Sequence, residues 1–329
     1  MMLMIAEIVG PSVILLGEVV MEPEKVVPYF GTIEKPECHM LYNVTTMAST
    51  WHTVATHDIR LLKKQMDIVN GLPKEYVFLN YLRCHDDIGW GLDYPTLKSW
   101  GLEEISHKRY LNDFFTGKVQ GSVSRGELYN DDPVTMDARF CGTTASMCGI
   151  ESALYEKDAN KLEEAVRTDL MLHAYMLVQS GIPMLYSGDE VGQLNDYTYK
   201  ENPSKAVDSR YLHRGAFQWE AADKCKDTDT VEGKLFTTLS TLEKVRRTES
   251  VFDADANAYT YDVKDNSILA IIRMKEEERF LGIFNFSNET KTAWIQEEGT
   301  FKDLLTGKKF QMKDYVLPPH GFVWAKKVK

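Results

Sequence analysis

The 329-residue chain lacks several features that mark particular classes of protein. It has no apolar run of about 18 residues, the length that a membrane-spanning helix needs, so we expect no membrane span. Acidic residues are in excess, with a formal net charge of -11, and no basic cluster of the kind that binds nucleic acid stands out. No Lys or Arg precedes Lys25, which argues against a signal peptide.

Metal-binding and disulfide patterns are also missing. The five cysteines are scattered, odd in number, and form no CxxC pair, and the histidines show no zinc spacing. We therefore predict no metal and no cofactor. Scattered reduced thiols are typical of cytoplasmic proteins, and we expect a cytoplasmic location.

What is present fits a large α/β domain followed by a small one. Short apolar runs at residues 13–16, 38–42, 76–84 and 182–186 are typical of strands that are covered on both faces of a parallel sheet. Helical spacing predicts one long helix over 45–69 and further helices over 162–179 and 235–247. Such alternation of strands and helices predicts right-handed βαβ units.

Two regions depart from this alternation. Residues 88–150 lose any clear period and are rich in Gly, Asn and Asp, so we expect an inserted lobe there. After residue 250, short apolar segments separated by turn residues predict a C-terminal antiparallel β-sandwich domain. The expected domains are therefore 1–250, with its lobe at about 88–150, and 251–329.

Acidic side chains follow two of the predicted strands. Glu18 comes directly after the first apolar run, and His85, Asp86 and Asp87 follow the strand at 76–84. In barrel enzymes the catalytic groups lie at the carboxyl ends of the strands, so these residues are candidates for a site. Trp90, just beyond them, is either a core residue or a platform for a sugar ring.

Three segments together resemble the α-amylase family, glycoside hydrolase family 13, and most closely its amylosucrase-like branch. They are residues 15–19 (LLGEV), 80–90 (NYLRCHDDIGW), and 181–192 (GIPMLYSGDEVG) with the following 208–214 (DSRYLHR). The resemblance implies a partial (β/α)8 TIM barrel, namely its last four strand–helix units, followed by a C-terminal antiparallel β domain. The middle segment is the most specific of the three.

The resemblance also implies a function and roles for particular residues. The function is that of an α-glucoside-active retaining glycosidase or glucosyltransferase, acting on an α-glucoside or sucrose-like sugar. Glu18 resembles the general acid/base and Asp86 the carboxylate that stabilises the transition state, while His85, Asp87 and Arg210 resemble substrate-binding residues. Retaining glycosidases need carboxyl groups a few ångströms apart across the scissile bond, which agrees with this assignment.

One expected element is missing. The family's nucleophile is an aspartate on the strand before the acid/base strand, yet the first aspartate here is Asp58, within the helix predicted over 45–69. We therefore expect a truncated chain that is inactive alone and requires a second chain that completes the barrel, or a homo-oligomer. The alternative is a catalytically inactive fragment or a carbohydrate-binding remnant. Hydrolysis and transfer stay equally open.

Overall fold

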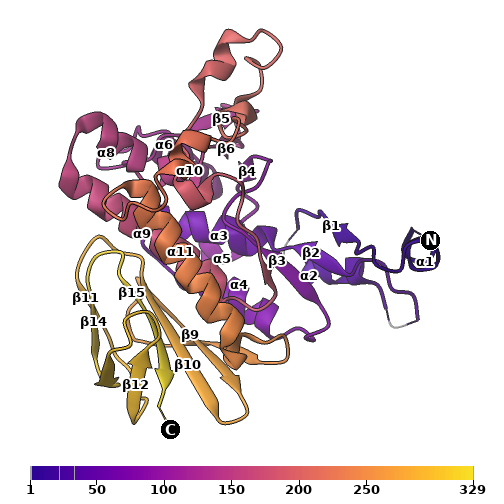
Figure 1. The fold of residues 1–329 in the computed structure, drawn as a ribbon. Coiled ribbons are helices and arrows are strands. Elements are labelled where there is room, and N and C mark those ends of the chain that lie inside the picture. Colours follow the sequence, from indigo (N-terminus) through magenta and orange to yellow (C-terminus); the bar gives the residue numbers. More distant parts are fainter. Residues whose placement is uncertain (1, 22, 33, 329) are drawn as a thin grey trace.

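The computed structural model describes residues 2–21, 23–32 and 34–328 (Figure 1). Its first part contains a parallel sheet whose four strands lie in the order β1 (Leu16–Gly17), β2 (Met40–Tyr42), β3 (Val77–Asn80) and β7 (Ile182–Pro183). The α/β class predicted from the sequence is confirmed. Because the strands are parallel, the residues that follow each of them lie at one edge of the sheet.

The strands are shorter than the apolar runs predicted. Only Leu16 and Gly17 of the first run pair with β2, and Val13 and Ile14 are 53% and 62% exposed. The expectation that this run is covered on both faces is therefore wrong. The physical reason is that Val13 and Ile14 precede β1, so they lie outside the paired part of the sheet and no second layer covers them.

The single helix predicted over 45–69 is two helices, α3 (Val44–Thr56) and α4 (Arg60–Asn70). His57 ends α3 in the left-handed conformation, with a φ of 56°. The amide of Ile59 then donates to the carbonyl of Asn266, which lies in the C-terminal part of the chain. This tertiary hydrogen bond fixes the break between the two helices, and the spacing of apolar residues does not predict it.

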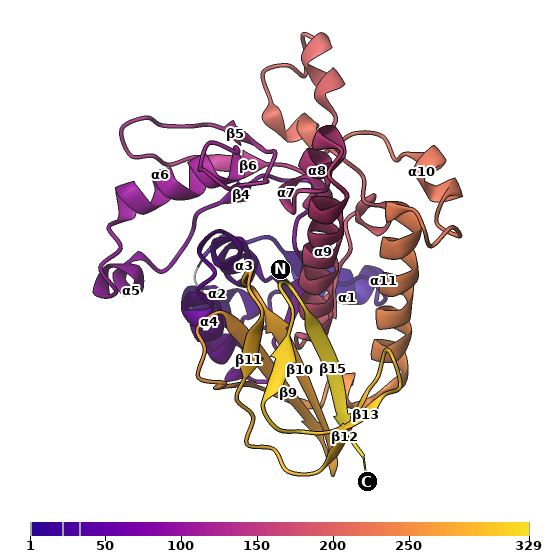
Figure 2. The same ribbon diagram turned by 90° about the vertical axis from the view of Figure 1, so that its left-hand side faces the viewer.

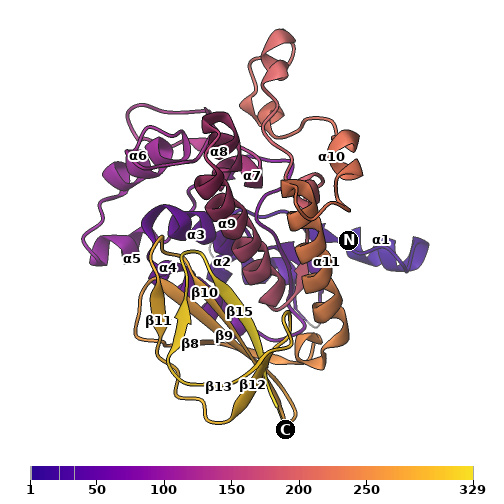
Figure 3. The same ribbon diagram turned by 60° about the vertical axis from the view of Figure 1, so that its left-hand side comes forward.

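Two long helices, α9 (Ala159–Val178) and α11 (Val231–Thr248), pack side by side against the C-terminal strands (Figure 3). The Asp158 side chain caps α9 by accepting from the amides of Asn160 and Lys161. Side chains of α9, α3 and the C-terminal sheet then form one large core that includes Trp51, Tyr175 and Phe284. Among the described residues, no helix is long and apolar enough to cross a membrane.

The region at 88–150 forms a lobe that Figure 2 shows on the left. Its three strands lie in the order β4-β6-β5 and are antiparallel. The rings of Phe115 and Phe140 pack on Trp51, which attaches the lobe to α3. The lobe contains β4 (Ile88–Gly89), α5 (Tyr94–Ser99), α6 (Glu104–Phe115), β5 (Glu127–Tyr129) and β6 (Arg139–Cys141). The following helices α7 (Thr144–Met147) and α8 (Ile150–Glu156) pack on α9.

The C-terminal part is an antiparallel β structure, as predicted. Six strands form one sheet in the order β13-β12-β15-β10-β9-β8, and β11 and β14 form a separate pair. One face of the large sheet packs on α9, and the other packs on the β11–β14 pair. Its strands are β8 (Asn257–Tyr261), β9 (Ile268–Lys275), β10 (Glu278–Asn285), β11 (Lys291–Ala293), β12 (Thr300–Asp303), β13 (Lys309–Gln311), β14 (Tyr315–Leu317) and β15 (Phe322–Lys327).

The remaining elements are short. The helix α1 (Met2–Val9) projects from the side of the sheet where β1 lies, away from the β domain (Figures 1 and 3). The others are α2 (Pro23–Val26), η1 (Val27–Phe30), η2 (Asp189–Val191), η3 (Tyr197–Glu201), η4 (Ser209–Leu212), α10 (Trp219–Asp223) and η5 (Ser250–Phe252).

Candidate active site

The structure brings two of the predicted catalytic residues together. Glu18 directly follows β1, and Asp86 lies six residues after the end of β3. One ligand atom from each of Glu18, His85 and Asp86 lies within 4.8 Å of the others. Glu18 and His85 are exposed and Asp86 is partly exposed, so all three side chains are accessible to a ligand.

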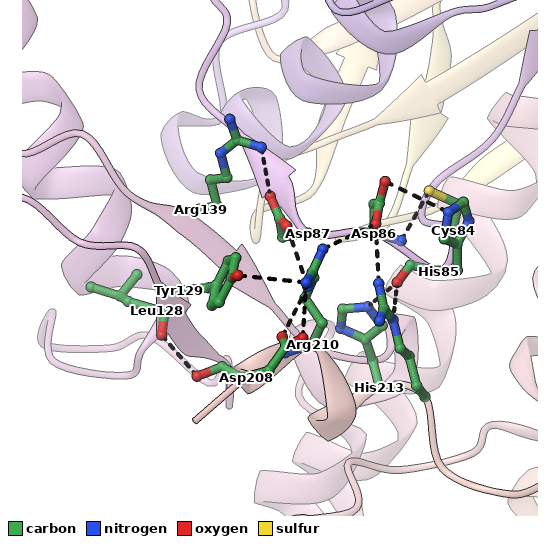
Figure 4. A network of polar contacts seen from close by, with 12 residues as sticks. Cys84, His85, Asp86, Asp87, Leu128, Tyr129, Arg139, Asp208, Arg210 and His213 are labelled. Atoms are coloured by element: carbon green, nitrogen blue, oxygen red, sulfur yellow. Dashed lines mark hydrogen bonds and ion pairs between the residues drawn. The ribbon is translucent and has the colours of Figure 1, made fainter. Parts of the chain in front are cut away.

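Basic side chains surround Asp86 (Figure 4). Its Oδ1 atom lies 3.0 Å from Nη2 of Arg214 and 3.5 Å from Nη1 of Arg210, and its Oδ2 atom lies 3.6 Å from Nε2 of His85. The contact with Arg214 is a hydrogen bond that Asp86 accepts. Basic groups thus reach both oxygens of the Asp86 carboxyl group.

The layer behind the carboxylates is neutral and largely buried. Burial, opposed in part by a hydrogen bond from the amide of Asp86, raises the pKa of the Cys84 thiol to about 11. Burial also raises the pKa of Tyr42 and Tyr81, and the nearby charges of Glu18 and Asp86 add to the effect. The two tyrosine rings meet edge to face at 5.2 Å. Glu18 and Asp86 thus lie over a surface that stays uncharged at neutral pH.

Arg210 lies between the carboxylates of Asp86 and Asp208. Its Nε and Nη2 atoms donate to the two oxygens of Asp208 at 2.9 and 2.8 Å, and its guanidinium lies 4.7 Å from the centre of the Tyr129 ring. The hydrogen bond from Arg210 is the main reason why the pKa of Asp208 is lowered. The prediction that Arg210 binds substrate stays untested, and its strongest contact here is with Asp208.

Asp87 and Trp90 are both much less exposed than Asp86. The Asp87 side chain is 4% exposed; it pairs with Arg139 at 3.3 Å and lies 4.0 Å from Nε of Arg210. That Asp87 binds substrate stays a prediction. Trp90 is a core residue, 3% exposed and stacked on Phe140 at 4.9 Å, which rules out sugar stacking in this structure.

The sequence analysis did not assign Arg214 or His213 to the site. Arg214 Nε donates to the carbonyl of His85, in addition to the contact of Arg214 with Asp86. His213 Nδ1 accepts from the amide of Gly142, so its Nε2 carries the proton and faces the same carbonyl at 3.3 Å. Both residues contact His85, which lies about 130 positions away in the sequence. The sequence indicated these contacts only through the position of His213 and Arg214 close to Arg210.

A buried ionic chain lies beneath the site. Arg83 Nε donates to Asp189 at 2.8 Å, and the two side chains are 2% and 3% exposed. His173 lies 4.0 Å from Asp189 and 2.9 Å from Asp169. Burial alone would lower the pKa of His173, but the two carboxylates, chiefly Asp169, raise it to about 9. The chain connects the end of β3 with α9 and with the loop after β7.

Glu18, His85 and Asp86 are the one group among the described residues whose side chains could together bind a metal ion. Arg214 and Arg210 already supply positive charge to Asp86, which disfavours a second cation there. We assign no metal to this cluster.

The chain is similar to parts of several known enzymes. A family model described as the β-galactosidase C-terminal domain matches residues 268–323, within the antiparallel sheet. Glucosylglycerate phosphorylase of Escherichia coli is 22% identical over 97% of this chain and 53% of its own length. Trehalose synthase of Thermus thermophilus is 22% identical over 95% of this chain and 31% of its own length.

The fold comparison agrees. A crystal structure of AmyP in complex with maltose superposes with a TM-score of 0.61 over 94% of this chain and 54% of that protein, at 13% identity. The chain thus spans about half, or less, of the proteins that it matches. The resemblance predicted from the three sequence segments is confirmed: over almost its whole length this chain is similar to part of proteins that resemble the α-amylase family (glycoside hydrolase family 13), and it shares their fold.

Proposed function

We propose that this chain provides the proton-transfer and sugar-binding residues of an α-glucoside-active retaining glycosidase or glucosyltransferase. The observation that supports this most is the convergence of Glu18 and Asp86 from two different strands. The names of similar proteins point to the same substrates: a glucosylglycerate phosphorylase, a trehalose synthase and an amylase-fold protein bound to maltose. The amylosucrase-like branch, the cytoplasmic location and a domain boundary near residue 250 belong to the same proposal.

In this proposal Glu18 is the general acid/base. It would protonate the leaving oxygen in the first step and deprotonate the incoming water or acceptor hydroxyl in the second. Its exposed carboxyl meets the requirement that this group must reach the glycosidic oxygen. His85, which is 51% exposed, would donate a hydrogen bond to the same sugar.

Asp86 lies close enough to Glu18 that it could itself be considered as the attacking group, since the two carboxyls of retaining enzymes are about 5 Å apart. Its contacts favour another role. The Oδ1 atom is held by Arg214 and Arg210, and an ion-paired oxygen is a weaker nucleophile. We therefore assign Asp86 to sugar hydroxyls and to stabilisation of the positively charged transition state.

The attacking carboxylate would then come from a further polypeptide segment beside β1. Two features support this. The β1 strand has an open edge, with β2 as its partner on the other side. Leu16 of β1 is exposed, and so are large apolar side chains in the segments before and after it: Met4, Ile5, Ile8, Val9, Val13, Ile14 and Val20. Exposed apolar edges of this size are typical of interfaces. We infer that the sheet is one half of a barrel, completed by another segment, a second chain or a second copy.

A chimaera tests this assignment. The chain would be joined behind the N-terminal half of the Escherichia coli glucosylglycerate phosphorylase, and turnover of α-glucosides would be measured. Glu18→Gln and Asp86→Asn should each lower kcat by at least about a hundredfold, because each removes a group that acts in the transition state. Glu75→Gln, an exposed change before β3, is the matched control and should leave kcat unchanged.

If Glu18→Gln or Asp86→Asn were as active as the parent chimaera, the assignment of that residue would be wrong. If the parent chimaera bound sugar without turnover, the alternative of a carbohydrate-binding remnant would hold instead.

A further inference from the structure

A cavity lies at the opposite end of the parallel sheet from Glu18 and Asp86. It has a volume of about 380 Å³ and is lined by the first residues of β3 and β7 and by strands β8 and β9 of the antiparallel sheet. Glu18 and Asp86 instead follow the carboxyl ends of their strands. The volume lies within the range of small-molecule sites. The cavity is thus distinct from the proposed active site.

Apolar and aromatic groups make up most of its wall. They include Leu72, Tyr76, Phe78, Phe252 and Ala256. The Tyr76 ring is held in place by stacking on Phe30, with ring centres 4.5 Å apart and planes within 4°. A preformed wall of this kind suits the apolar body of a ligand.

Two basic side chains line this space: the exposed Lys74, whose ammonium donates to the carbonyl of Asp255, and Arg273, which is 1% exposed. The Arg273 guanidinium donates to the carbonyls of Val251, Val178 and Asp253 at 2.6, 3.0 and 3.3 Å and to the hydroxyl of Ser180 at 3.2 Å. All four acceptors are neutral. Arginine has five donor hydrogens, so one hydrogen of Nη2 has no acceptor among the residues that the structure describes.

A further, half-buried cation increases the excess of positive charge. Arg246 donates to the carbonyls of Leu177, Gln179 and Gly181 at the end of α9, and it lies on the Phe252 ring, as Arg273 does. Within the described ranges neither arginine forms an ion pair. Burial, and for Arg273 also the charge of Arg246, lowers the pKa of Arg273 to about 9 and that of Arg246 to about 10. A buried cation without a counter-ion is costly, and an anion would offset that cost.

The charge of the ligand is limited by Asp253. This carboxylate also lines the cavity, and Lys275 binds it at 2.6 Å. A dianion would be repelled by Asp253 more strongly than a monoanion would. We propose that this cavity is a binding site for a small organic monoanion, a carboxylate with an apolar body, whose carboxylate accepts from Arg273 and whose body lies against Tyr76, Phe78 and Phe252.

The test uses the 329-residue chain and three probes that share a phenyl ring: benzoate, its neutral isostere benzamide, and phenyl phosphate. Binding is measured by calorimetry, and alanine methyl groups are followed by NMR. Benzoate should bind saturably and shift the methyl signals of Ala256 and Ala258, which line the cavity. Benzamide should bind at least about tenfold more weakly, since it lacks the charge-assisted hydrogen bond. Phenyl phosphate, a dianion at pH 8, should also bind more weakly than benzoate.

Two variants locate the site. Arg273→Gln should weaken benzoate binding by at least about tenfold. Because Arg273 also holds the end of α9, Ala256→Leu gives an independent readout: it fills the cavity, leaves the guanidinium in place and should abolish the methyl shift at Ala258. Arg279→Gln is the control, since Arg279 pairs with Glu297 and does not line this cavity. Equal affinity for benzoate and benzamide, tighter binding of phenyl phosphate, unchanged binding in Ala256→Leu, or no binding of benzoate would each overturn the proposal.

Discussion

The buried histidine beneath the candidate site should make the stability of this protein depend on pH. His173 is 1% exposed and lies 2.9 Å from Asp169 and 4.0 Å from Asp189. These carboxylates outweigh burial and raise the pKa of His173 from 6.5 to about 9. The difference corresponds to roughly 3 kcal/mol of stabilisation by the proton on His173.

The sign follows from the direction of this change. Because the pKa of His173 is higher in the folded chain than in the unfolded chain, its contribution is fully present below about pH 6.5. It is lost as the pH rises towards 9, where the folded protein also releases the proton. His52 and His213 do not contribute in this window, since burial lowers the pKa of each to about 3.

Urea unfolding, followed by tryptophan fluorescence between pH 6.5 and 9, measures this contribution. The free energy of unfolding should fall by roughly 2–3 kcal/mol more in the parent than in His173→Gln across the window. Buried thiols, whose pKa is raised, add a fall towards pH 9 that both proteins share. His52→Gln is the matched control, because it alters a buried histidine that stays neutral throughout, and it should keep the parent's pH dependence. Equal slopes for the parent and His173→Gln would refute the reasoning.

Two further predictions concern the fold around this region. Gly181→Ala should lower the free energy of unfolding by more than about 2 kcal/mol, because Gly181 has a φ of 103° and an added Cβ would lie 2.2 Å from the carbonyl oxygen of Phe78. A change below about 0.5 kcal/mol in urea unfolding would contradict this. Asp158→Ala should lower the free energy of unfolding by about 1 kcal/mol, because it removes the cap of α9. Lys63→Gln, which breaks an exposed ion pair, should lower it by less than about 0.5 kcal/mol. Equal effects of the two changes in thermal unfolding would be inconsistent with the capping role.

The parts of the fold that depend on local patterns could be predicted from the sequence. The helices at 159–178 and 231–248 follow from apolar spacing and stop signals, and the antiparallel C-terminal strands follow from alternation and turns. The break at His57–Ile59 could not be predicted, because a hydrogen bond to Asn266 from a distant part of the chain fixes it. The exposure of Val13 and Ile14 was missed for a similar reason, since an apolar run does not reveal whether a second layer covers it.

The same distinction applies to the candidate site. Glu18 and Asp86 stand at strand ends, where parallel topology brings side chains together, so their proximity was predictable. Arg214 lies in an irregular loop, and its contact with Asp86 joins positions 128 residues apart. The burial of Asp87 depends on Arg139, which reaches it from β6 of the lobe. Neither contact has a periodic pattern from which it could be inferred.

The central claim is that Glu18 and Asp86 share a sugar site whose attacking carboxylate lies in a further polypeptide segment. The most direct measurement is turnover of 4-nitrophenyl α-glucoside and maltotriose by the purified 329-residue chain alone, beside the chimaera that contains a complete barrel. We predict turnover that depends on Glu18 in the chimaera and none in the isolated chain. Turnover by the isolated chain that disappears in its Glu18→Gln variant would contradict the account.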